Sequence, residues 1–88
     1  MKEDELVSVF AVIQTRSDRR LEENIANHTH LKIRDGVWLI AAEGTAKDVS
    51  DLLGVTEGQA GSAIILKPAA YHGRTSTDTW DWMRAHWG

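Results

Sequence analysis

The apolar residues in the first half of the chain follow strand patterns. Residues 6–13 form a nearly continuous β-branched run, which predicts a strand covered on both faces, or on one face at a dimer interface. Residues 30–34 alternate polar and apolar side chains, and residues 37–42 are all apolar. Asp35–Gly36 lies between these two segments and supplies the positive φ angles of a tight primed turn. We therefore expect an antiparallel hairpin.

The segment after the first strand has helical periodicity. Leu21, Ile25 and His28 recur at i, i+4 and i+7, and the charged residues 19, 20, 22 and 23 lie off that stripe. Ser17 or Asp18 can cap the start, and the helix should end near residues 27–29.

A second helix is marked at both ends. Thr45 followed by Asp48 resembles a capping box, and Gly54 suits the left-handed position after the last turn, with Val55 as its hydrophobic closure. The expected buried face consists of Ala46, Val49, Leu52 and Leu53.

The remaining segments follow the same two periods. Residues 56–62 read as a loop containing two glycines, which we expect to be a connection, because a phosphate-binding loop would follow a strand and open a helix. Residues 63–67 form a further apolar strand, which could continue toward Tyr71, although Pro68 would restrict that extension to an edge or a bulge. Thr77 or Asp78 is expected to cap a C-terminal helix.

The order strand, helix, strand, strand, helix, strand predicts one α+β domain over residues 1–88. It is the order of a ferredoxin-like βαββαβ sandwich, in which two helices cover one face of an antiparallel sheet, here with an added C-terminal helix. The other sheet face carries apolar residues that something must hide. A second copy or the tryptophan-rich tail could do so.

The chain resembles small bacterial proteins related to the CRISPR-associated adaptation subunit and the toxin-like proteins of its superfamily. The resemblance covers roughly residues 6–70 and is carried by residues 7–13, 36–40 and 44–46. The resemblance implies a ferredoxin-like homodimer. Some such proteins are metal-dependent nucleases with an aspartate at the end of the first strand. Here Gln14 and Thr15 occupy that region, and neither is an anionic ligand suited to Mg²⁺. We therefore expect the fold and the dimer but no catalysis. The tail reads as a helix where relatives often add a strand.

Charge gives one candidate anion site. The net charge of −3 argues against a broad nucleic-acid interface. Residues 1–34 hold six basic and six acidic side chains, whereas residues 35–88 hold four and seven. Arg16, Arg19 and Arg20 gather at a strand exit and a helix start, where phosphate could bind, with Arg74 as a further contributor. The alternative is a solvated helix turn whose arginines pair with nearby carboxylates.

Other polar groups suggest little chemistry. The chain lacks cysteine, and its four histidines have no recurring zinc spacing, so we expect neither metal nor cofactor. Tyr71 and His72 follow the last core strand and are the candidate ligand loop; the alternative is a hydrogen-bonded connection that anchors the last helix.

The C-terminal helix is the candidate interface element. Trp80, Met83 and Trp87 follow i, i+3 and i+7, and Trp82 lies on another face. Tryptophan is enriched at interface hot spots. Base stacking on single strands is another use of such residues, but Asp78 and Asp81 would repel phosphates.

No apolar run has the length of a membrane span, and the acidic start lacks signal-peptide features, so we expect a cytoplasmic protein. The sequence favours a non-catalytic homodimeric interaction module, acting through protein contacts. An anion-binding or nucleic-acid-binding module is the alternative, and a metal-dependent nuclease ranks below both.

Overall fold

The computed structural model describes residues 7–87, which form a small α+β unit with a four-stranded antiparallel sheet and three helices. The elements in chain order are β1 (Val7–Arg16), α2 (Arg19–Ala26), β2 (His30–Arg34), β3 (Val37–Glu43), α3 (Ala46–Leu52), β4 (Ser62–Leu66) and α4 (Thr77–His86). This is the predicted element order. Leu6, predicted to open the first strand, lies outside the described residues.

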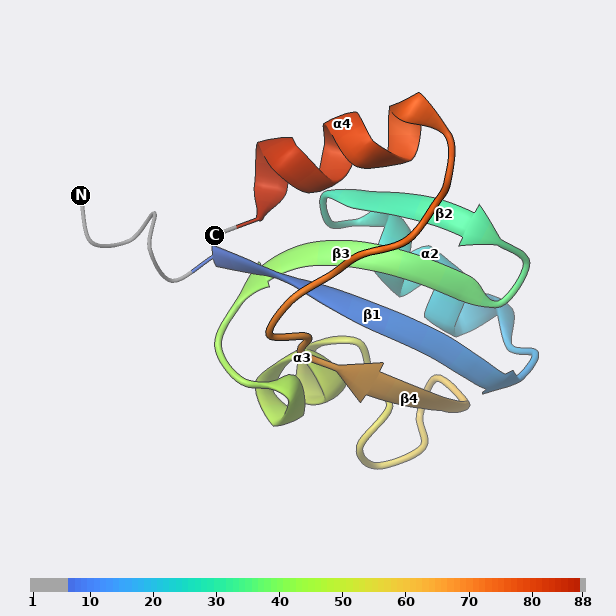
Figure 1. Ribbon diagram of the computed structural model, residues 1–88. Helices are drawn as coiled ribbons and strands as arrows, with labels where there is room; N and C mark the ends of the chain where they lie inside the picture. Colours follow the sequence, from blue (N-terminus) through green and yellow to red (C-terminus); the bar gives the residue numbers. More distant parts are fainter. Residues whose placement is uncertain (1–6, 88) are drawn as a thin grey trace.

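The strands lie in the order β2-β3-β1-β4, and each neighbouring pair is antiparallel. The predicted hairpin of β2 and β3 is therefore confirmed. The two long strands β1 and β3 form the centre, and β2 and β4 are the edges. Figure 1 shows α2 and α3 behind the sheet, whereas the chain after β4 crosses the front and α4 lies there.

The core lies between the sheet and the two rear helices. Its buried residues are Phe10, Val12, Leu21, Ile25, Trp38, Ile40, Val49, Leu53 and Ala60. Leu21 and Ile25 of the predicted stripe are buried, whereas its third member, His28, is half-buried and lies beyond the end of α2. The amide of Asn24 in α2 donates to the carbonyl oxygen of Leu53 at 2.9 Å, which ties the two helices together.

The predicted ends of α3 are confirmed. The Asp48 amide donates to the Thr45 hydroxyl at 3.1 Å, and the Thr45 amide donates to the Asp48 carboxylate at 2.9 Å. This reciprocal capping box satisfies two N–H groups that the first turn would otherwise leave unpaired. Gly54 has φ +79°, and Val55 packs against the core.

The hairpin turn differs from the predicted primed turn. Gly36 has φ +84°, but Asp35 does not have a positive φ. The register shifts between Lys32 and Arg34, so a bulge takes up the extra residue. The prediction of a primed turn was wrong because one glycine with positive φ, combined with a bulge in β2 just before the turn, also matches the twist of the two strands.

Several boundaries also differ from expectation. The first strand continues to Arg16, and the last strand begins at Ser62 and ends at Leu66, so it does not pass Pro68. Ser76, rather than Thr77 or Asp78, precedes α4 as its cap residue. Leu52 was predicted to be buried but is 52% exposed, because α3 is short and turns only Val49 and the following Leu53 fully toward the sheet.

Candidate functional site

The second face of the sheet, which we call the open face, is apolar throughout its middle. Phe10 lies in the core beneath the helices, so Val9 and Ala11 on either side of it point to the opposite face. The register then assigns the neighbouring strands. The apolar residues that the register places on the open face are Val9, Ala11, Ile13, Leu31, Val37, Leu39, Ala41, Ile64 and Leu66, and Arg34 lies beside Val37 at the end of β2.

The C-terminal segment covers part of this face. α4 packs against β1 and β2, and the chain between β4 and α4 runs across the sheet (Figure 1). Met83 of α4 and Val9 of β1 are both buried, with 5% and 2% exposure. We expected either a second copy or the tryptophan-rich tail to cover this face, and the tail covers part of it within a single chain.

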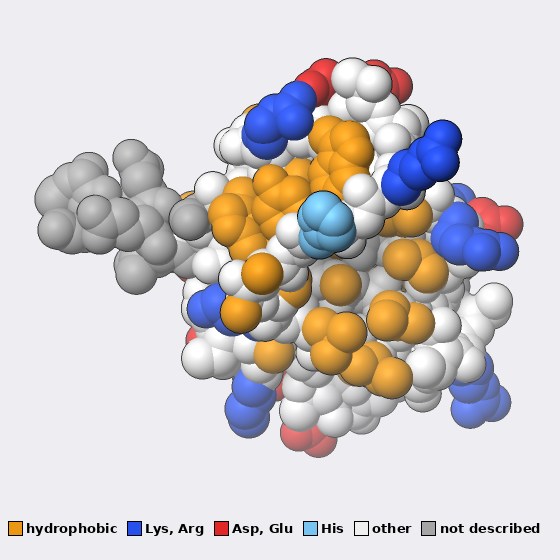
Figure 2. All heavy atoms as spheres, in the orientation of Figure 1, with side chains coloured by type: hydrophobic (Ala, Val, Ile, Leu, Met, Phe, Trp, Pro, Cys, Tyr) orange, Lys and Arg blue, Asp and Glu red, His pale blue; other side chains and the backbone are white. Residues whose placement is uncertain are grey.

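The rest of the open face stays uncovered. Two rows of side chains run across the sheet there, Val37–Ile13–Ile64 and Leu39–Ala11–Leu66. We call these six residues the open patch. Ile64 is 50% exposed and Leu66 is 47% exposed. Figure 2 shows apolar side chains gathered over this lower part of the face, apart from the apolar group beside α4.

The predicted interface residues of α4 are engaged within the chain. Met83 is buried, and Trp80, Trp82 and Trp87 are half-buried. The ring of Trp82 lies 4.4 Å from that of His86, and the His86 Nδ1 lies 2.9 Å from the Trp82 carbonyl oxygen. These aromatic residues hold the tail together, whatever further contacts their exposed parts make.

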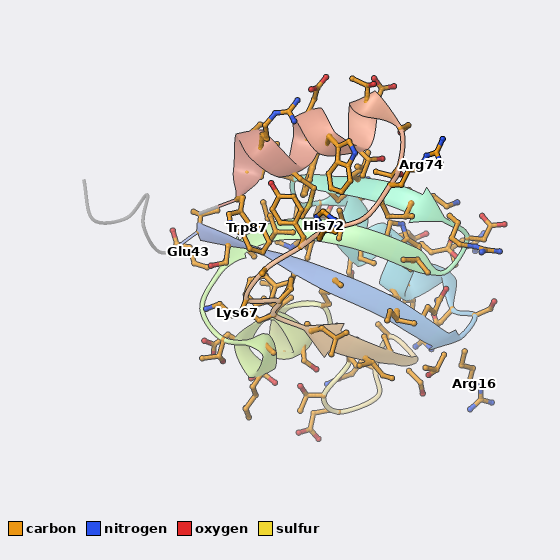
Figure 3. The ribbon with its side chains drawn as sticks, in the orientation of Figure 1. Arg16, Glu43, Lys67, His72, Arg74 and Trp87 are labelled. Carbon is orange, nitrogen blue, oxygen red and sulfur yellow. The ribbon has the colours of Figure 1, made fainter. Side chains whose placement is uncertain are left out.

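Tyr71 and His72 form the candidate ligand loop, but only Tyr71 packs against α4. The Tyr71 ring stacks on Trp80 at 5.7 Å and meets the edge of Trp87 at 4.6 Å. Such aromatic pairs add stability beyond that of their buried area. Tyr71 therefore holds the segment between β4 and α4 against α4. His72 is exposed above the middle of the sheet, and the labelled side chains of Figure 3 place it away from Arg16 and Lys67.

The predicted arginine cluster is largely neutralised. Asp18 caps α2 by accepting from the Arg20 amide at 2.9 Å. The Arg20 guanidinium donates to both Asp18 oxygens, at 3.1 and 2.8 Å. These side-chain bonds, and then the backbone bond, lower the pKa of Asp18 below its usual value. The helix start therefore already holds an anion, and Arg19 lies 3.6 Å from Glu23.

Arg16 is the one member of the cluster that forms no ion pair within residues 7–87. It lines two adjoining surface cavities of about 460 and 560 Å³. The first also holds Lys32, Glu22 and Asp35, and Lys32 pairs with Asp35 at 2.9 Å. Arg74 comes from the segment that precedes α4 and lies far from Arg16 in Figure 3. The structure therefore does not join Arg74 to this cluster.

No three histidine or acidic side chains of residues 7–87 converge as metal ligands would. Gln14 and Thr15 lie in β1, where the resembling nucleases have an aspartate. Within the same residues, no helix combines the length and the apolar character needed to cross a membrane.

Comparisons with protein-family models, curated proteins and solved structures give no match to this chain. The resemblance to the CRISPR-associated adaptation subunit superfamily therefore stays a prediction.

The sequence did not single out the residues of the open patch. Residues 63–66 are all apolar, so no alternation shows which side chains face the helices. Only the register with β1 assigns Ile64 and Leu66 to the open face. The one available signal was the combination of a continuous apolar strand with too few helices to cover both faces.

Proposed function

We propose that this protein is a non-catalytic interaction module with a ferredoxin-like fold, which forms a homodimer through the open patch. The fold assignment is supported by the strand order. The order β2-β3-β1-β4 puts β3 between β1 and β2, and β1 between β3 and β4. Each βαβ unit is thus split by a strand of the other unit.

The observation that carries the proposed dimer is the exposure of Ile64 and Leu66 beside Ile13 in a continuous apolar surface. Burying apolar surface stabilises association by roughly 25 cal/mol per Å² before the costs of association are subtracted. The six side chains of the open patch are all apolar, and the charged Arg34 lies only at its border, beside Val37. A second copy of the same patch matches it in chemistry.

Sedimentation over a range from low micromolar to near-millimolar concentration tests this proposal. We expect a reversible dimer, and we expect Leu66→Lys to shift the chain to monomer at every concentration. Leu52→Lys is the matched control, because Leu52 is equally exposed but lies on α3 behind the sheet. A wild-type chain that sediments as a monomer throughout would contradict the proposal, and so would equal effects of the two lysine variants.

A second candidate function is anion binding at Arg16, which lines both cavities at the end of β1. Ser17, Gly58 and Gly61 border the larger cavity with Arg16. Titration with inorganic phosphate and with single-stranded DNA at low salt tests it. We expect binding that Arg16→Gln removes and that added salt weakens. Binding that survives in Arg16→Gln, or no binding at low salt, would exclude this site.

A further inference from the structure

The outer edge of β4 has no backbone partner within residues 7–87. β4 pairs with β1 on one side, and no loop or helix of the described chain donates to or accepts from the backbone of residues 62–66 on the other side. Backbone groups in a folded protein are nearly always paired with protein or water. This edge therefore presents groups that water or another strand must satisfy.

The register identifies which groups point outward. The Gln14 amide donates to the Gly36 carbonyl oxygen at 2.8 Å, so the backbone of Gln14 points toward β3. In an antiparallel sheet, the backbone N–H and C=O groups of successive residues point toward opposite neighbouring strands. Those of Ile13 therefore point toward β4. Ile13 pairs with Ile64, whose backbone therefore points inward. The N–H and C=O groups of Ala63 and Ile65 consequently face out from the edge.

We propose that two copies pair edge to edge through β4, antiparallel about a two-fold axis at Ile64. This inference rests on the proposed homodimer and specifies how it is built. Ala63 of each copy lies opposite Ile65 of the other, and these are the outward-facing residues. Each such pair exchanges two hydrogen bonds. Two four-stranded sheets thereby become one sheet of eight strands.

The side chains of β4 are complementary to themselves in this register. On the helix side, the small Ala63 faces the large Ile65 of the second copy. On the open side, the small Ser62 faces Leu66, and Ile64 meets its own counterpart. No charged residue lies within Ser62–Leu66, so the axis brings no like charges together.

The arrangement also joins the two open patches. β4 is the edge on the uncovered side, whereas α4 packs over β1 and β2. The axis therefore brings Ile64 and Leu66 of both copies into one apolar surface, with the two C-terminal helices at its outer ends. A second copy of this chain is the favoured partner, because the edge of β4 is complementary to itself and the apolar patch beside it meets an identical apolar patch.

Oxidative cross-linking tests the register directly, because the natural chain has no cysteine. At the axis, Ile64→Cys places two thiols on a non-hydrogen-bonded pair, whose Cα atoms lie about 4.5 Å apart. A disulfide accepts that separation. After mild oxidation, we expect the full-length variant to run as a disulfide-linked dimer on a denaturing, non-reducing gel.

Two controls separate this register from random collision. Leu66→Cys has similar exposure on the same strand, but its two Cα atoms would lie roughly 14 Å apart, four residues along the strand. Ile33→Cys lies on the other edge strand and is 43% exposed. We expect both to run largely as the uncross-linked chain on the same gel. Equal cross-linking of Ile64→Cys and Leu66→Cys would overturn the proposed register.

A backbone variant distinguishes the edge contact from a contact between open faces. Ala63→Pro removes an outward N–H, and proline is tolerated on an edge strand when that N–H faces away from the sheet. We expect it to lose the dimer while circular dichroism stays native. If wild type dimerises and folded Ala63→Pro dimerises equally, the edge contact is wrong and the homodimer stands. If wild type is monomeric and Ile64→Cys does not cross-link, both proposals fail.

Discussion

The two edge strands of the sheet, β2 and β4, differ in the properties that govern pairing with a further strand. β2 carries His30, Lys32 and Arg34, it holds the extra residue of its bulge with β3, and α4 packs against it. The ladder between β1 and β4 also has a register shift, but there the extra residue lies on β1 and not on the edge strand. β4 carries no charge and no proline between Ser62 and Leu66. Charges and bulges are the devices by which proteins block edge pairing. The sheet is thus protected at one edge only.

This asymmetry determines what edge pairing can build. A sheet open at both edges could add copies indefinitely, whereas a sheet open at one edge can join only one further copy about a two-fold axis. The charged strand β2 therefore limits the proposed assembly to a closed dimer. Three variants test this difference between the edges.

The largest effect is expected when β2 is made like β4. In Lys32→Thr combined with Arg34→Thr, both edges lack charge, so we expect the closed dimer to give way to large assemblies, measured by light scattering and sedimentation. Lys47→Thr with Arg84→Thr is the matched control, since it removes the same charge from α3 and α4. An unchanged size distribution in the β2 variant would show that charge on β2 does not limit assembly.

A smaller effect is expected when the cover over the β2 side is loosened. Met83 is 5% exposed and packs α4 onto the sheet. Met83→Ala removes most of its buried side chain, and we expect the free energy of unfolding to fall by about 2 kcal/mol. Urea denaturation measures this change. The exposed Leu52→Ala should change it by less than about 0.5 kcal/mol, and equal losses would show that Met83 does not anchor the tail.

The smallest effect concerns the charged turn at the end of β2. The hydrogen bond from Lys32 lowers the pKa of Asp35 below its usual value of 3.8. A carboxyl whose pKa falls on folding stabilises the folded state above its unfolded pKa, and the contribution disappears as pH drops through the folded pKa. We expect wild type to lose a small stability advantage over Asp35→Asn below about pH 4. Parallel pH profiles of thermal unfolding for the two chains would contradict this.

Local signals in the sequence predicted the fold well wherever a side chain has one possible role. Thr45, Asp48 and Gly54 specify the two ends of α3 by hydrogen bonding and backbone conformation alone, and both ends are confirmed. The type of turn at Asp35 was not determined by its sequence, because a single positive φ with a bulge closes the hairpin as well as two positive φ angles do.

The arginine cluster was decided by a local contact. Arg20 was expected to attract anions, but its guanidinium is bonded to Asp18, two residues earlier, which also caps the helix. The rest of the candidate site depended on pairing between distant segments, which the sequence does not encode locally. Tyr71 was a candidate ligand group, yet it packs against Trp87 at the other end of the tail. Ile64 gained its role only from its register with Ile13.

The placement of the tryptophans has a practical consequence for optical measurement. Trp38 is buried in the core, and the other three tryptophans of the chain lie between residues 80 and 87. In Trp38→Phe, all indole fluorescence would come from the tail. That variant would report the release of the tail from the sheet alone, and the difference between its emission and that of wild type would report the surroundings of Trp38 as the core melts.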